Sequence, residues 1–225
     1  MLLLSPNLIF NFDLGGIFFM KRKIFMFALI FAALIFSVGA SKNDDEIKRM
    51  GIFVSNFTEL SMYDFDLEED GDESMLHLGS PEGMEELIRF GIGHNIINNK
   101  KLIQKCTRKK CEYGQSTIKK ESVSASVKKY FDLPVEHQNL FGNAPEAEFD
   151  GKLYHFDKKD WDNDTIYYAE VKKVEKTRRV ITMTGELYNI KDKSDRPATF
   201  TAKAKPHKWN NKDTWAILSL TVEWK

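Results

Sequence analysis

The 225-residue sequence has no excess of charge of either sign, because 33 Lys and Arg residues balance 33 Asp and Glu residues. Basic patches supply most of the sequence-independent affinity of proteins for nucleic acid, so we expect no nucleic acid partner. The sequence also lacks a P-loop, a G-x-S-x-G elbow and an H-E-x-x-H zinc motif. Its histidines are scattered along the chain at His77, His94, His137, His155 and His207. We therefore assign no catalytic residue, no metal site and no cofactor, and the sequence favours a protein that is not an enzyme.

One long apolar run is present, and it lies near the amino terminus at Ile24–Phe36. The basic residues Lys21–Lys23 precede it and the small residues Ser37–Ala40 follow it. This is the layout of a secretory signal peptide, and the run is shorter than the roughly twenty residues of a membrane-spanning helix. We predict a signal peptide over residues 20–40, with residues 1–19 an over-extended start before Met20. An uncleaved amino-terminal anchor is the alternative.

Export by a bacterium to the periplasm or the cell exterior follows from this prediction, with membrane contact only through the signal peptide. The mature chain, residues 41–225, would have 30 basic and 32 acidic residues and a net charge of −2. Its length suits a single globular domain. No internal repeat or low-complexity segment divides it.

The carboxy-terminal third has the alternation of apolar and polar residues that indicates strands with one buried face. We predict strands over residues 165–174, 179–190, 198–205 and 216–224, with a bulge near Lys172 and Pro206 ending the third. The inward-facing sets in the last two strands are Ala198, Phe200, Ala202 and Ala204, then Ala216, Leu218, Leu220, Val222 and Trp224.

The preceding residues indicate helices and short strands. Apolar spacing predicts helices over residues 44–57 and from Pro81 onward, the second capped by Ser80. Ser124 is predicted to cap a further short helix that Pro134 stops, a hairpin is possible within residues 102–123, and Lys152–Phe156 suggests a strand. The predicted fold class is α+β, with amino-terminal helices packed on a curved antiparallel sheet of about four to five strands, mainly within residues 151–225.

Acidic residues crowd into the segment 64–73, which raises the possibility of a calcium loop. With Gly71 at the sixth position of an EF-hand loop, the twelfth position is His77, where a bidentate Glu is required. A second acidic run at Asp160, Asp162 and Asp164 is followed by Thr165 in place of glycine. We favour solvated loops over weak calcium sites for both segments.

Two cysteines, Cys106 and Cys111, are the whole cysteine content of the chain. An exported protein meets an oxidising compartment, which favours a disulfide between them over free thiols. Two cysteines supply only half of a structural zinc site, and no histidine stands nearby at ligand spacing.

Aromatic residues are concentrated in the predicted sheet, where most are expected to pack in the core. A minority could line a pocket in the concavity of the sheet, and the candidate ligand-binding residues are Tyr154, Tyr168, Tyr188 and Trp215. The order of helices before bent antiparallel strands, with a final strand Thr214–Leu220 opened by tryptophan, resembles the NTF2-like or cystatin-like superfamily over residues 80–224. The resemblance implies an exported ligand-binding or interaction module, or less often an enzyme with an Asp/His pair in the cone.

Three functional hypotheses follow. The first is a non-enzymatic envelope or secreted protein that binds an unknown small molecule or an envelope protein. The second is a hydrolase or isomerase with a histidine, such as His155, beside a carboxylate from Asp157, Asp160 or Asp162 in the concave sheet. The third is a structural or adhesive envelope protein with an exposed aromatic patch.

Overall fold

A computed structural model describes residues 44–67, 74–161 and 166–225. The chain divides into two compact units, residues 1–46 and 47–225, and the account below concerns the second. In the described part of the chain, no helix has both the length and the apolar composition to cross a bilayer. The predicted signal peptide and the acidic segments 68–73 and 162–165 lie outside the described residues.

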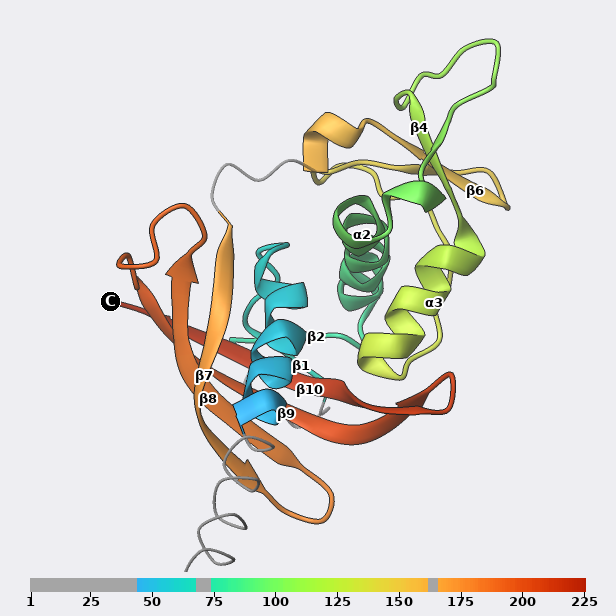
Figure 1. Ribbon diagram of the computed structural model, residues 1–225. Helices are drawn as coiled ribbons and strands as arrows, with labels where there is room; N and C mark the ends of the chain where they lie inside the picture. Colours follow the sequence, from blue (N-terminus) through green and yellow to red (C-terminus); the bar gives the residue numbers. More distant parts are fainter. Residues whose placement is uncertain (1–43, 68–73, 162–165) are drawn as a thin grey trace, which may run out of the picture. The chain divides into compact units, whose positions relative to one another are not determined.

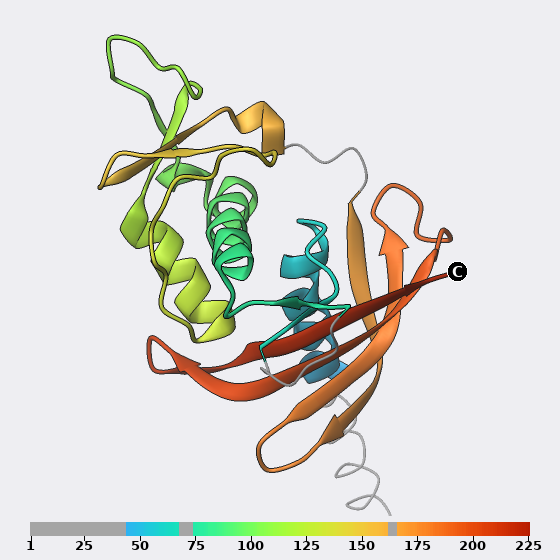
Figure 2. The ribbon, with the colours of Figure 1, turned by 180° about the vertical axis from the view of Figure 1, so that it is seen from behind.

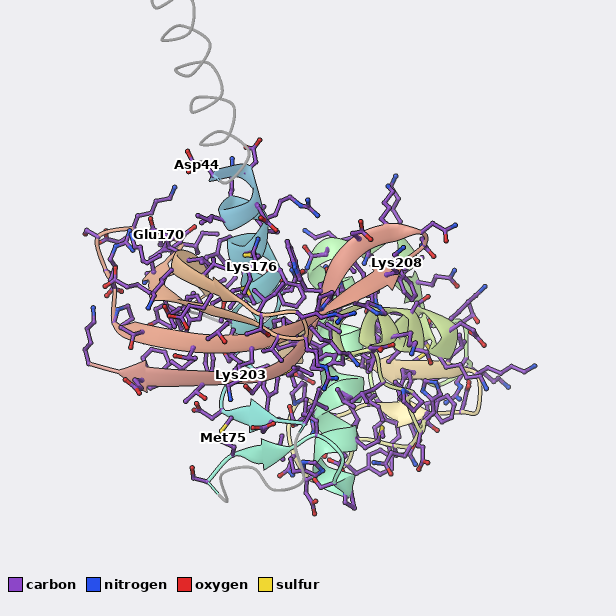
Figure 3. All side chains as sticks on the ribbon, turned by 90° about the horizontal axis from the view of Figure 1, so that it is seen from below. Asp44, Met75, Glu170, Lys176, Lys203 and Lys208 are labelled. Atoms are coloured by element: carbon purple, nitrogen blue, oxygen red, sulfur yellow. A yellow bond between two sulfur atoms is a disulfide. The ribbon has the colours of Figure 1, made fainter. Side chains whose placement is uncertain are left out.

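The larger sheet has six strands among the described residues, in the order β2-β1-β10-β9-β8-β7 (Figure 1). Four long antiparallel strands make up most of it: β7 (Tyr167–Lys176), β8 (Ile181–Asn189), β9 (Ala198–Trp209) and β10 (Lys212–Trp224). The short strands β1 (Phe65–Asp66) and β2 (Leu76–His77) extend it beyond β10. Lys203 of β9 is exposed and alternates with the buried Ala202 and Ala204, so it lies on the outer side of the sheet (Figure 3).

The helix over residues 44–58 packs its apolar side against the concave face of this sheet (Figures 1 and 2). Phe53 and Phe57 belong to one buried cluster with side chains from all four long strands. The helix also bonds to the edge strand β7, since the Ser55 hydroxyl accepts from the Ala169 amide at 3.0 Å and the Thr58 hydroxyl donates to the Tyr167 carbonyl at 2.7 Å. These bonds cover backbone groups that an edge strand otherwise leaves open.

Two more helices and a second sheet complete the unit. Helix α2 (Pro81–Asn98) is followed by a 3₁₀ turn (Lys100–Leu102), and helix α3 (Lys120–Phe131) follows β4. The second sheet has the order β3-β4-β6-β5 in the described chain, with β3 (Gln104–Lys105), β4 (Ser116–Lys119), β5 (Glu148–Phe149) and β6 (Leu153–Phe156). A second 3₁₀ turn, η2 (Lys158–Trp161), follows β6.

Helix α2 serves two apolar cores. Leu87 and Phe90 join the core under the large sheet, whereas Ile88, Ile92 and Ile96 join the core under the small sheet. The predicted cap is present, since the Ser80 hydroxyl accepts from the Gly83 amide at 3.0 Å. The α+β class is thus confirmed, but the long sheet has more strands than expected and the second sheet was not predicted as a separate layer.

The prediction for β10 was wrong at two positions, Leu218 and Trp224. The pairing of β10 with β9 shifts register between Ile217 and Ser219. This irregularity changes which residues face the core there, so that Ile217 is fully buried and Leu218 is only half-buried. Trp224 lies on the same face as the buried Leu220 and Val222 but at the end of the strand, where it is 51% exposed. The inward residues predicted for β9, by contrast, all lie in the core.

Pro206 does not end β9, contrary to the prediction. Strand β8 pairs with β9 only as far as Ala204, so Pro206 occupies a stretch with one free edge, where proline is tolerated. The strand continues to a two-residue turn in which Asn210 and Asn211 have φ of 49° and 61°. Such left-handed conformations at both positions match the twist of a tight hairpin, and asparagine adopts them readily.

The bulge predicted near Lys172 is present, because the pairing of β7 with β8 shifts between Val171 and Lys173. The predicted helix at Ser124 begins earlier, at Lys120, and Ser124 is not its cap. Its hydroxyl instead lies 2.8 Å from His137 Nε2.

The helix-filled sheet generates the first prediction. Phe57→Ala removes a fully buried ring from the centre of the large core and should lower the free energy of unfolding by about 3–5 kcal/mol. Ile52→Ala is the matched control, because Ile52 is on the same helix but 60% exposed, and it should change stability by less than about 0.5 kcal/mol. Chemical denaturation measures both, and equal losses would contradict the described packing.

Candidate functional site

The four candidate ligand-binding residues do not form one site. Trp215 lies in the large core, with its ring centroid 5.7 Å from that of Phe53 and the Arg49 guanidinium 5.3 Å from its own centroid. The helix over residues 44–58 therefore occupies the place where the sequence predicted a ligand.

Tyr168 and Tyr188 face each other as a cross-strand pair on β7 and β8, with ring centroids 6.2 Å apart. Arg196 lies over the Tyr188 ring at 5.8 Å. Burial and the nearby Glu59 raise the pKa of the Tyr168 hydroxyl. This pair is a half-buried packing contact of the large sheet.

Tyr154 belongs to the other sheet and is fully buried. Its hydroxyl is 2.8 Å from His137 Nδ1, and its ring stacks on Phe149 with centroids 4.8 Å apart. Burial raises the pKa of this hydroxyl well above its usual range. Tyr154 is thus a structural residue of the second core.

A hollow of about 200 Å³ opens beside Trp161, which the sequence analysis placed only in a polar turn. The end of η2, the turn after the helix over residues 44–58, helix α2 and the loop before β5 all contribute to it. Its apolar and small wall residues are Leu60, Met62, Phe90, Ala144, Pro145 and Trp161, and its charged residues are Glu86, Arg89 and Asp160.

Arg89 is buried in the wall of this hollow, and its charge is balanced by its own helix. Its guanidinium donates to Glu86 at 2.9 Å and to Glu85 at 3.3 Å, which stand three and four residues earlier on α2. A third bond runs from Nη2 to the Asn143 carbonyl at 3.1 Å and ties α2 to the loop before β5. The arginine therefore holds the loop against the helix.

Two residues that line the hollow each have a buried N–H donor without a partner among the described residues, Arg89 Nε and Trp161 Nε1. Both side chains are buried, with Arg89 at 8% and Trp161 at 9% exposure. A buried donor without an acceptor costs about 1–3 kcal/mol, and native structures contain few of them. An acceptor bound in the hollow would remove that cost.

The walls and charges of the hollow decide which ligand suits it. Rings and aliphatic groups offer apolar contact, and the two donors offer hydrogen bonds to a carbonyl or hydroxyl oxygen. Glu86 and Asp160 disfavour an anion, because the positive charge of Arg89 is already paired with carboxylates. The geometry supports binding and places no nucleophile against a general base.

A second hollow, of about 370 Å³, lies on another side of Trp161. Its lysines, Lys100, Lys158 and Lys159, are exposed, and Ile96, Ile97 and Ile166 form its apolar part. Glu59 also lines it. Because exposed lysines bind water and many solutes without selectivity, this hollow indicates a class of ligand less clearly than the first.

Glu59 leads into a buried polar network between the first helix, α2 and α3. The Asn98 amide donates to Glu59 Oε1 at 2.7 Å and to His94 Nδ1 at 3.2 Å. Because the amide nitrogen can only donate, Nδ1 of His94 acts as an acceptor and the ring is neutral. Burial, with a smaller contribution from Lys129, lowers the pKa of His94 to about 4.

Tyr130 closes the network on the side of α3. Its hydroxyl donates to Asn56 Oδ1 at 3.1 Å and accepts from Lys129 Nζ at 2.9 Å. Burial lowers the pKa of Lys129, and burial together with Glu59 raises that of Tyr130. Glu59, His94 and Tyr130 are buried whereas Asn98 is exposed, and the network joins the three helices.

The hypothesis of a histidine and a carboxylate in the concave sheet does not match the structure. His155 does lie beside a carboxylate, but the partner is Asp150, with Nε2 2.9 Å from Oδ2, and not Asp157 or Asp160. Both residues belong to the small sheet and its turn, and Asp162 lies outside the described residues. Within residues 44–67, 74–161 and 166–225, no group of three or more His, Cys, Asp or Glu side chains is placed to hold a metal ion.

Sequence reasoning missed Arg89, although a signal was available. Arg89 follows Leu87 and Ile88 on the apolar side of α2, and a charge among buried positions of a helix needs a specific partner. Trp161 carried no such signal, because a tryptophan in a polar turn is compatible with an exposed position.

Comparison of this chain with protein families, with curated proteins and with solved structures finds no match. The function is therefore inferred from the geometry alone.

The second prediction concerns pH. The unfolded chain protonates His94 near pH 6.5, whereas the folded chain resists protonation until about pH 4. The unfolded state thus binds more protons in this interval, and stability should fall by on the order of 2 kcal/mol as the pH drops from 7 to 4.

His94→Gln should flatten this part of the stability curve. Glu59 acts in the opposite direction, because burial raises its pKa and its proton uptake favours the folded state at low pH. Glu59→Gln should therefore make the loss steeper. Urea unfolding at several pH values measures both, and a His94→Gln slope equal to that of the unchanged protein would refute the assignment.

Proposed function

We propose that this protein is an exported, non-enzymatic binding protein that takes a small neutral organic ligand in the hollow beside Trp161. The observation that carries the proposal is the pair of buried N–H donors, on Arg89 and Trp161, that lack an acceptor beside an apolar hollow. Ligand pockets commonly combine apolar walls with a few placed polar groups.

The ligand is small. The hollow of about 200 Å³ is below the usual range of about 300–1,000 Å³ for drug-sized ligands, so it accommodates one ring with a short substituent. A carbonyl oxygen on that substituent would serve one or both donors. An aromatic amide has this combination of ring, carbonyl oxygen and zero charge.

Export is supported by the signal-peptide layout before Ala40 and is consistent with the disulfide between Cys106 and Cys111. An envelope location also fits a binding protein whose ligand comes from outside the cell. The weak resemblance to NTF2-like proteins points the same way, although the concave face that such proteins use is filled here by the helix over residues 44–58.

The third prediction uses benzamide as the probe. In a ¹H–¹⁵N spectrum of the purified protein, millimolar benzamide should shift the indole N–H resonance of Trp161, which Trp161→Phe identifies by its loss. Benzoate should produce a smaller shift, because Glu86 and Asp160 repel its charge.

Two variants at one exposed position make the test specific. Ala144→Leu fills the hollow from its rim and should abolish the shift, whereas Ala144→Ser keeps the hollow open and should retain it. The proposal fails if benzamide at about 10 mM leaves the Trp161 resonance unmoved. It also fails if Ala144→Leu responds to benzamide like the unchanged protein. A shift of the Trp161 resonance on addition of a purified envelope protein, without a shift from benzamide, would support the interaction hypothesis.

The fourth prediction concerns export. Protein produced by a bacterial host with the whole sequence should appear in the envelope or medium fraction with Ser41 as its first residue. Substituting both Ile30 and Leu34 by Arg interrupts the apolar run and should retain the uncleaved chain in the cytoplasm. Uncleaved chain found in the membrane fraction would support the anchor instead.

A further inference from the structure

The disulfide between Cys106 and Cys111 lies against an ordered group of ionisable side chains. Cys106 follows β3 and is buried, with 7% exposure, whereas Cys111 is half-buried in the loop that leads to β4. The two sulfurs therefore differ in access. A thiol that arrives from solvent reaches Cys111 first.

His155 stands directly behind the buried sulfur. Its Nδ1 lies 3.7 Å from Cys106 Sγ, and its Nε2 lies 2.9 Å from Asp150 Oδ2. A carboxylate can only accept, so Nε2–H donates to Asp150 and Nδ1 is the ring atom that faces the sulfur. The order sulfur, imidazole, carboxylate is the arrangement that activates a cysteine nucleophile.

Asp150 is held in place by several donors. It occupies the turn between β5 and β6, which Gly151 closes at a φ of 92°, and it accepts from the Lys152 and Leu153 amides at 2.9 and 2.7 Å. Burial alone would raise its pKa, but His155, these amides and Arg108 keep that pKa well below its usual range. The carboxylate that orients His155 is thus ionised.

Arg108 connects this group to the disulfide ring itself. It lies between the two cysteines and bonds Asp150 at 2.8 Å and Glu148 of β5 at 2.5 Å. The small disulfide loop is therefore fastened to the second sheet by two ion pairs. Opening the disulfide leaves these ion pairs in place.

We propose that Cys106–Cys111 is a thiol–disulfide exchange centre in which His155, oriented by Asp150, stabilises Cys106 as the leaving thiolate. A leaving sulfur that is stabilised as a thiolate departs faster. The short loop argues in the same direction, since a disulfide that closes few residues constrains the unfolded chain less than one that closes many. The proposal does not depend on the ligand hollow.

A thiolate from a low-molecular-weight thiol attacks Cys111 Sγ and forms a mixed disulfide there, while the Cys106–Cys111 bond breaks and its electron pair goes to Cys106 Sγ. One proton from solvent, carried by Nδ1 of His155, is shared with this sulfur as the bond breaks. A second thiolate attacks the mixed disulfide, releases the oxidised thiol and leaves Cys111 as a thiolate, so two electrons pass from two thiols to the protein.

The fifth prediction tests this with reduced glutathione, followed by acid quenching and mass spectrometry of the purified protein. Trypsin cuts after Lys105, Arg108 and Lys110, so the two cysteines fall on different peptides. The first glutathione adduct should be on the Cys111 peptide. His155→Gln should slow reduction at pH 7 on the order of tenfold, and Asp150→Asn should slow it in the same direction.

His137→Gln is the matched control, because His137 is in the same core region but bonds Tyr154 and Ser124 instead of the disulfide. The rate at which glutathione reduces this variant should be unchanged.

The sign of the effect separates a chemical from a structural role. A variant that only loosens the fold exposes the disulfide and speeds its reduction. Circular dichroism confirms that each variant is folded, and Asp150→Asn, which keeps the side-chain size, replaces His155→Gln if the latter unfolds. Reduction at an equal or higher rate in the folded variant overturns the proposal.

Discussion

The burial of helix α2 on two sides is the constraint on which the rest of the described structure depends. A helix can serve two cores only if its neighbours approach closely, and glycines permit this: a Cβ on Gly91 would stand 2.6 Å from Val123 Cγ1, and one on Gly93 would stand 2.7 Å from Leu60 Cδ2. Its polar residues must also be satisfied within the protein. Asn95 meets this demand through bonds to the Gly91 carbonyl at 2.7 Å and the Ser126 hydroxyl at 2.9 Å. Arg89 meets it only in part, and its unpaired Nε marks the hollow beside Trp161.

The helix over residues 44–58 determines where function can reside. By filling the concave face of the large sheet, it turns the four long strands into a support for the helices. The candidate binding and reactive groups then lie around Trp161 and around Cys106. Both are carried by turns of the small sheet, in agreement with the general tendency of binding and reactive groups to lie on loops held by a rigid scaffold.

Local patterns predicted well the parts of the fold that neighbouring residues decide. The alternation of Ala198, Phe200, Ala202 and Ala204 identified the buried face of β9, and the phase change near Lys172 identified the bulge in β7. The same method failed at Leu218, because a register shift in pairing reverses the faces of a strand without a clear trace in its composition. It failed at Pro206 because the length of the neighbouring strand β8, and not the proline, decided whether an N–H was needed there.

The sequence by itself determined the α+β class, the cap of α2 at Ser80, the positions of the main strands and the neutral charge of the chain. These properties depend on periodicity and on side chains within a few residues of one another. Only the tertiary structure decided that His155 meets Asp150 and Cys106, that Arg89 and Trp161 line one hollow, and that Phe53 packs on Trp215. The physical reason lies in residues 99–116 and 132–152, which have little periodic pattern. The two cores that these segments cover set their paths, and those paths bring residues distant in sequence into contact.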